Sequence, residues 1–97
     1  MLLCGLKLWS TNEQYVNEAI RLYDAGIYQY IELFAVPKSY EKFINIWSAL
    51  KIPYVIHAPH FSAGLNLSNV EYLTGNLEKA QETFQFADTL QASIVIF

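Results

Sequence analysis

The sequence predicts an α/β protein built on a parallel β-sheet, and three features of the chain support this. Short apolar runs rich in β-branched and aromatic residues alternate with longer segments whose apolar residues repeat at helical spacing. Four runs and three segments give the order β-α-β-α-β-α-β, in which right-handed crossovers bring successive strands parallel. No cluster of glycines follows any strand, so dinucleotide-binding and phosphate-loop folds are not predicted.

The first strand is predicted from about Leu2 to Trp9, a β-friendly run with a single charge. Ser10 is followed three residues later by Glu13, which matches a capping box, so we expect Ser10 to cap the first helix. Gly26 is expected to stop this helix because glycine readily adopts the left-handed conformation. Four helix residues fall on one face and are expected to point inward: Val16, Ala19, Ile20 and Tyr23.

The second strand is predicted over residues 30–36, where Pro37 ends it. Ser39 is expected to cap the second helix, and residues 54–56 are expected to form the third strand. The inward face of the second helix repeats the same spacing, with Phe43, Ile46, Trp47 and Leu50.

A loop of about ten residues is predicted after His60, followed by a longer helix and a fourth strand over residues 93–97. Gly75 and Asn76 weaken the start of that helix. Its inward residues are predicted to be Leu73, Leu77, Ala80, Phe84 and Ala87. Its solvated face is predicted to carry Glu78, Lys79, Glu82 and Asp88.

The composition fits one small domain that occupies residues 1–97. The chain is 54% hydrophobic and 15% charged, which leaves apolar side chains in excess for 97 residues. The net charge of −3 argues against a broad phosphate-binding surface, so a nucleic-acid partner is not expected. The single cysteine, Cys4, excludes an internal disulfide and is expected to be buried in the first strand. No apolar run is long enough for a bilayer, so the sequence predicts a soluble cytoplasmic protein without a membrane partner.

The fourth strand is the least protected element of the predicted sheet. The run Ile-Val-Ile-Phe at residues 94–97 is typical of a strand buried on both faces, but no helix of the sequence follows to cover it. An uncovered apolar edge favours pairing with another chain. We therefore expect a homo-oligomer that forms through exposed strand edges.

The only two histidines, His57 and His60, follow the third strand. Chemistry in α/β proteins collects where parallel strands end, and imidazole suits metal binding and proton transfer near neutral pH. Alternation places Val55 and His57 on one face of the sheet. His57 is interpreted as a metal or substrate contact in preference to a hydrogen-bonded core group, whereas His60 fits a substrate contact or a solvated loop residue equally well. Two histidines alone do not complete a catalytic zinc site, which needs three protein ligands.

Three more residues are candidates for contact with a substrate. Glu32 lies within an apolar strand, where it could contact a substrate hydroxyl or pair with Lys7. Trp9 could stack on a sugar ring or pack at the rim of the core. Asn66 could bind a ligand or turn its own loop.

Several segments resemble the xylose isomerase-like TIM barrels: Gly5–Ser10, Ile31–Phe34, and Ile56–Phe61 followed by Leu65–Leu67. This superfamily includes sugar (phosphate) isomerases and epimerases and nucleases of the endonuclease IV type. The resemblance covers the whole chain but only the N-terminal half of the family's barrel, which implies four strands of a parallel (β/α)8 barrel. It also implies a divalent metal (Zn, Mn or Mg) with His57 at the position of a metal ligand. The family's acidic ligands lie on later strands, so this fragment need not retain the metal.

The resemblance implies that the chain is the N-terminal portion of a metal-assisted sugar or sugar-phosphate isomerase or epimerase. A sugar or sugar phosphate would then be its substrate, its catalytic residues would lie elsewhere, and this fragment would be weakly active or inactive. Two alternatives remain open. One is an endonuclease IV-like phosphodiesterase that acts on damaged DNA, and the other is a non-catalytic half-barrel that acts through self-assembly.

Overall fold

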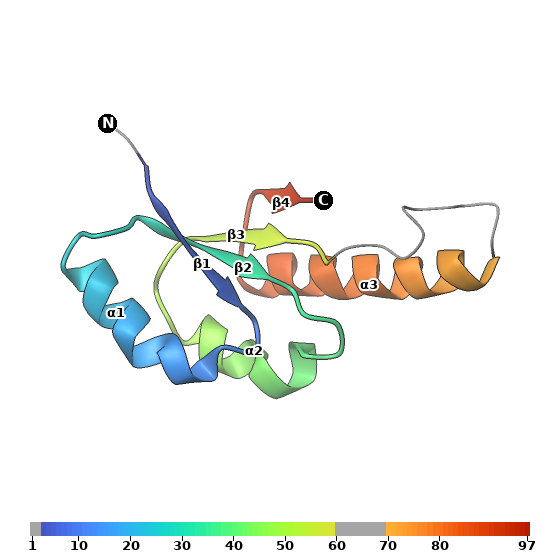
Figure 1. Cartoon of the computed structure of the whole chain (residues 1–97), viewed down its shortest axis with the longest axis horizontal. Helices are drawn as coiled ribbons and strands as arrows, with labels where there is room; N and C mark the ends of the chain where they lie inside the picture. The colour runs from blue at the N-terminus through green and yellow to red at the C-terminus, as the bar shows by residue number, and fades with distance from the viewer. Residues whose placement is uncertain (1–2, 60–69) are drawn as a thin grey trace.

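The computed structural model describes residues 3–59 and 70–97, including the side chains of all of them except 70–74. Four strands alternate with three α-helices, in the order predicted from the sequence (Figure 1). The elements are β1 (Gly5–Trp9), α1 (Val16–Asp24), β2 (Tyr30–Phe34), α2 (Tyr40–Ser48), β3 (Tyr54–His57), α3 (Val70–Thr89) and β4 (Val95–Ile96), with a short 3-10 helix η1 (Glu13–Tyr15) before α1.

The strands form one sheet in the order β1-β2-β3-β4, and every neighbouring pair is parallel. The prediction of an α/β protein with a parallel sheet is therefore confirmed. All three helices lie on the same side of the sheet (Figure 1). Sequential parallel strands with helices on one face are compatible with an arc of a (β/α) barrel, since doubly wound sheets carry helices on both faces.

The hydrophobic core fills the space between the sheet and the helices. Alternate strand residues point into it, and Ile31, Leu33 and Ile56 are completely buried there. Trp47 of α2 and Phe86 of α3 are equally buried and supply the largest side chains of the core. The predicted inward face of α2 is correct, because Phe43 and Trp47 are buried and Ile46 and Leu50 pack against the same cluster.

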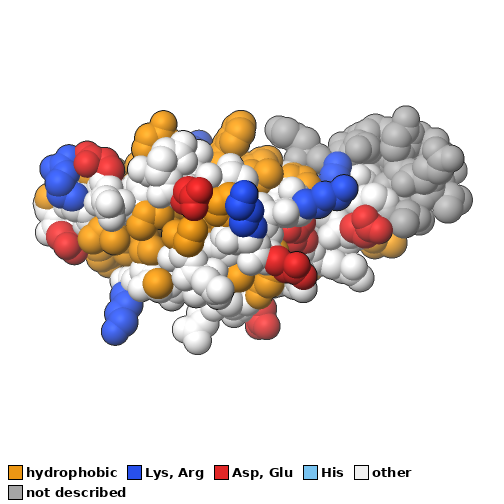
Figure 2. Space-filling view, turned by 90° about the horizontal axis from the view of Figure 1, so that it is seen from below, with side chains coloured by type: hydrophobic (Ala, Val, Ile, Leu, Met, Phe, Trp, Pro, Cys, Tyr) orange, Lys and Arg blue, Asp and Glu red, His pale blue; other side chains and the backbone are white. Residues whose placement is uncertain are grey.

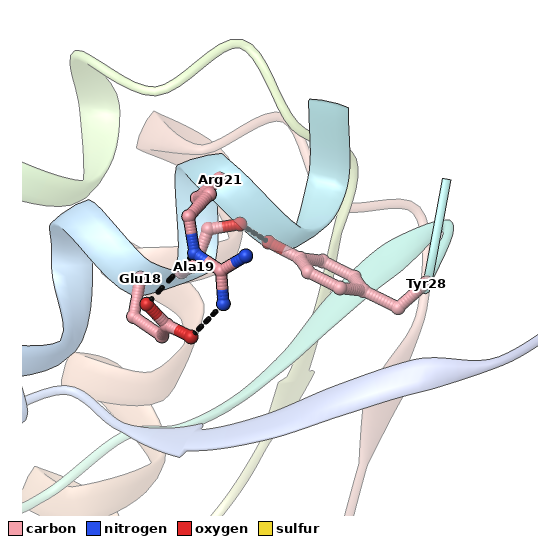
Figure 3. A network of polar contacts seen from close by, with 4 residues as sticks. All are labelled: Glu18, Ala19, Arg21 and Tyr28. Atoms are coloured by element: carbon pink, nitrogen blue, oxygen red, sulfur yellow. Dashed lines mark hydrogen bonds and ion pairs between the residues drawn. The ribbon is translucent and has the colours of Figure 1, made fainter. Parts of the chain in front are cut away.

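The loop between α1 and β2 is held by local contacts that follow the predicted helix stop. Gly26 adopts a φ of 77°, the left-handed conformation expected of a residue that ends a helix. The Tyr28 hydroxyl donates a hydrogen bond of 2.6 Å to the Ala19 carbonyl, and burial raises the pKa of Tyr28 (Figure 3). Beside it, the hydrogen bond from Arg21 lowers the pKa of Glu18 on the exposed side of α1 (Figure 3).

The predicted inward face of α1 is only partly correct. Ala19 is buried, but Ile20 is 40% exposed. Seen from below in Figure 2, apolar side chains gather over the α1 and α2 end of the molecule. A groove between these helices is lined by residues that include Val16, Ile20, Tyr23, Ile46 and Leu50.

The predicted capping box at Ser10 and Glu13 is wrong. Neither η1 nor α1 receives a hydrogen bond from a capping side chain. Ser10 is instead completely buried, where its hydroxyl lies 2.6 Å from that of Ser39 and accepts a hydrogen bond from the Val36 amide. The Ser10 carbonyl also accepts a hydrogen bond from the Trp47 indole at 2.7 Å. Ser10 therefore ties β1 to the β2–α2 connection instead of starting a helix.

The amino end of α2 is capped by a residue from another helix. Ser39 occupies the N-cap position but makes no capping hydrogen bond, because its hydroxyl donates to the Val36 carbonyl. The Glu82 carboxylate of α3 accepts hydrogen bonds from the amides of Lys38, Ser39 and Tyr40 at 2.8, 3.0 and 2.9 Å. The prediction of Glu82 as a solvated residue is therefore wrong, because it joins α3 to α2.

The inward face predicted for α3 is also wrong in part. Ala87 is buried as expected, but Leu77 and Phe84 are more than half exposed, while Thr83 and Phe86 are completely buried. The residues that face the sheet thus lie about a quarter turn away from the predicted stripe. Leu73 was also predicted to point inward, and its side chain lies outside the described residues.

Both edge strands of the sheet expose side chains, which the sequence predicts for β4 but not for Cys4. Cys4 is exposed at the start of β1, so its predicted burial is wrong. In β4, Ile96 is 37% exposed, and Ile94 just before it is 54% exposed. The fourth strand is therefore not buried on both faces within this chain.

Candidate functional site

The face of the sheet opposite the helices carries most of the candidate residues. Residues of β1, β2 and β3 that point away from the core lie on this face, because side chains alternate along each strand. The register pairs Trp9 with Phe34, Phe34 with His57 and His57 with Ile96, so these four side chains form one row across the sheet. An open concavity of about 510 Å³ contains this row, and its lining residues are Lys7, Leu8, Trp9, Glu32, Phe34, His57 and Ile96.

His57 is the last residue of β3 and is held in a defined orientation. Its Nδ1 lies 2.8 Å from the Ala58 carbonyl oxygen, which can only accept, so Nδ1 carries the proton of the neutral ring. In this tautomer Nε2 is the acceptor, and no group among residues 3–59 and 75–97 forms a hydrogen bond with it. The imidazole ring stacks on Phe34 with 5.6 Å between ring centroids. A backbone carbonyl that fixes one ring nitrogen is a common support for a metal-binding or proton-transferring histidine.

Glu32 and Lys7 form an ion pair on the same face, one row nearer the amino ends of the strands. The Lys7 Nζ lies 3.7 Å from Glu32 Oε2, as expected if Glu32 is paired. The Glu32 side chain is 17% exposed and the Lys7 side chain is 84% exposed. Both residues line the concavity, so the pair can also present one cation and one carboxylate to a ligand there.

Trp9 closes the row at the β1 edge. Its ring lies 6.0 Å from Phe34 and is tilted by 37°, and the residue is 61% exposed. An exposed aromatic surface beside a carboxylate and an imidazole suits a ligand that has both apolar faces and hydroxyl groups, as sugars have.

The structure brings together three of the five predicted site residues, namely Trp9, Glu32 and His57. The other two, His60 and Asn66, lie outside the described residues. Sequence reasoning did not assign Phe34 and Ile96 to the site. Strand alternation was the signal that could have found Phe34, because residues 32 and 34 share a face.

The fit of a divalent metal to this site rests on His57, whose oriented imidazole suits one coordination position. Within the described part of the chain, no group of three or more His, Cys, Asp or Glu side chains is arranged to hold an ion. Any further ligands would have to come from other residues or from a partner.

No protein family, curated protein or solved structure matches this chain. Searched over its described residues, the structure contains no helix that combines the length and apolar character needed to cross a membrane. Because no known protein matches the chain, its function is inferred below from the geometry of the open face.

Proposed function

We propose that the open face of the sheet is part of the substrate-binding wall of a metal-assisted sugar or sugar-phosphate isomerase or epimerase. The observation that carries this proposal is the placement of His57 at the carboxyl end of a parallel strand. Its Nδ1 is hydrogen-bonded to a backbone carbonyl, and its Nε2 forms no hydrogen bond with the described residues around the concavity. Active sites of (β/α) barrels form at this end of the strands.

The neighbours of His57 favour a polyhydroxylated substrate. Trp9 and Phe34 offer aromatic surface for the apolar face of a sugar ring. The Glu32 carboxylate can accept hydrogen bonds from hydroxyl groups, and the exposed Lys7 ammonium can pair with a phosphate. A divalent metal, when bound, would polarise a substrate carbonyl. His57 would supply one of its ligands, and Glu32 would orient the adjacent hydroxyl groups.

Nothing in the described residues adds support to the nuclease alternative. Lys7 is the one cation among the residues that line the concavity. A protein that binds a DNA backbone usually clusters several Lys or Arg side chains.

Metal titration of the isolated chain tests the role of His57. We expect calorimetry to detect Zn²⁺ or Mn²⁺ binding that His57→Ala weakens at least tenfold, because the variant lacks the oriented imidazole. His60→Ala is the matched control, since it removes the only other imidazole of the chain. Equal metal affinity in the wild type and His57→Ala would contradict the proposal.

Fluorescence tests the sugar-binding role of the same face. Trp9 is exposed in the concavity and the only other tryptophan, Trp47, is buried in the core, so a bound sugar phosphate should change chiefly the Trp9 emission. The change should disappear in Trp9→Phe and weaken in Glu32→Gln, while Glu41→Gln on the exposed surface of α2 should leave it intact. A response that persists in Trp9→Phe would place the ligand elsewhere.

A further inference from the structure

The β4 edge exposes apolar side chains on both faces of the sheet. On the open face, Ile94 is 54% exposed and Ile96 is 37% exposed. On the helix face, Phe97 packs against Phe84 with 5.6 Å between ring centroids, yet these residues are 63% and 52% exposed. A helix laid on the sheet would cover only one of these faces. A strand added at the edge, with its own side chains above and below, would reach both.

The backbone of β4 is also oriented for such an addition. The Ile94 carbonyl accepts a hydrogen bond from the Ile56 amide of β3, and the Ile96 carbonyl accepts one from the Ala58 amide just after β3. Because backbone groups alternate in direction along a strand, the amide and carbonyl of Val95 face the open edge.

The opposite edge of the sheet, along β1, presents a short complementary stretch. The Ser10 amide donates to the Phe34 carbonyl of β2, so the backbone groups of alternate residues, Gly5, Lys7 and Trp9, face outward. At Trp9 both outward groups are already used, because the amide donates to the Asn12 side chain and the carbonyl accepts from the Asn12 amide. Gly5 and Lys7 therefore form the open part of this edge.

We infer that two copies of this chain pair through these edges, with β4 of each copy beside β1 of the other. Rotation by 180° about an axis parallel to the strands keeps all strands parallel and joins both pairs of edges at once. The product is a closed ring of eight parallel strands. Side chains can fill the interior of a ring of this size. Closure also removes both exposed edges and leaves no surface for further growth.

Pairing would bury apolar side chains that each copy leaves exposed at its edges. A fully buried aromatic side chain removes about 150–250 Å² from water. On that scale Phe97, Ile94 and Ile96 leave roughly 250 Å² of apolar surface uncovered in each copy. A pair would bury roughly 500 Å² from these side chains, to which the edge backbone and half-buried neighbours add.

The pairing deepens the proposed function because it would enclose the concavity around His57, but its test is independent of any ligand. Light scattering after size exclusion, in metal-free buffer at micromolar concentration, should give about 22 kDa, twice the 11.1 kDa of one chain. Ile94→Lys should restore the monomer mass, because it places a charge in the junction. Ile20→Lys is the matched control, since Ile20 is 40% exposed and lines the groove between α1 and α2, and it should leave the dimer intact.

Amide hydrogen exchange distinguishes edge pairing from other kinds of dimer. The Lys7 and Val95 amides should exchange at least tenfold more slowly in the wild type than in Ile94→Lys. A monomeric wild type, species that grow beyond two copies, or a dimer in which these amides exchange rapidly would each overturn the inference. None of these results bears on the metal affinity of His57. Conversely, weak metal binding by an intact dimer would contradict the proposed function and leave the inference of a dimer standing.

Discussion

The contact between Glu82 and the amino end of α2 gives the sharpest prediction about stability. One carboxylate from α3 accepts three backbone hydrogen bonds, from the amides of Lys38, Ser39 and Tyr40. It also supports Lys38 in the left-handed conformation, with a φ of 65°, which an L-residue adopts only at a cost. Glu82→Ala should therefore destabilise both the helix start and the docking of α3.

The magnitude follows from the exposure of the three amides. Hydrogen bonds to a charged acceptor contribute about 1.5–3 kcal/mol each when they are buried. The Lys38 amide is exposed and can bond to water, whereas those of Ser39 and Tyr40 are partly buried. Since loss of a capping side chain usually costs about 0.5–2 kcal/mol, we expect Glu82→Ala to lower the free energy of unfolding by about 2–3 kcal/mol. Glu82→Gln keeps one acceptor oxygen and should cost about 1 kcal/mol.

Urea unfolding followed by circular dichroism measures these changes, with all variants at one protein concentration because self-association would shift the midpoint. The matched control is Glu78→Ala, which removes an exposed carboxylate one turn earlier on α3 and should change stability by less than about 0.5 kcal/mol. The dependence on urea concentration should stay the same in every variant. The reasoning is refuted if Glu82→Ala and Glu78→Ala lose equal stability.

Two further predictions concern buried hydroxyl groups. Burial raises the pKa of Tyr54, so the folded state retains its phenolic proton after the unfolded state has lost it, and stability should fall as the pH rises above about 10. Urea midpoints between pH 8 and 11 should show this fall, which should be shallower in Tyr54→Phe but unchanged in Tyr15→Phe, a change to an exposed tyrosine. Ser10→Ala should cost about 1–3 kcal/mol, because it leaves the amide of Val36 without its acceptor. Ser48→Ala, at an exposed hydroxyl, should be nearly neutral, and a similar loss in both serine variants would contradict this account of Ser10.

Local sequence patterns predicted the order of helices and strands and the point where the first helix ends. The alternation of short apolar runs with amphipathic segments predicted the parallel sheet, and glycine chemistry predicted the stop at Gly26. Strand alternation placed Val55 and His57 on one face, and the register of β2 and β3 puts His57 beside Phe34 on the face opposite the core. These predictions succeeded because each depends on neighbours within a few residues along the chain.

The sequence-based predictions failed where the sequence of one segment is compatible with more than one structural role. Both flanks of α3 hold apolar residues, so its sequence could not select Phe86 over Phe84, and only contact with the sheet decided which was buried. Ser10 had the sequence context of a helix cap, but the tertiary structure placed it next to Ser39 and Val36, where bonding inside the core was available.

The sequence by itself determined the order of the elements, their parallel arrangement and the strand end that carries the imidazole. Only the tertiary structure decided that Glu82 caps a helix more than forty residues away, and that the row from Trp9 to Ile96 stays open while the opposite face is filled. The physical reason is the distance along the chain over which each kind of interaction acts. Hydrophobic period and turn chemistry act between near neighbours, whereas capping across helices and the exposure of a sheet face depend on where distant segments meet.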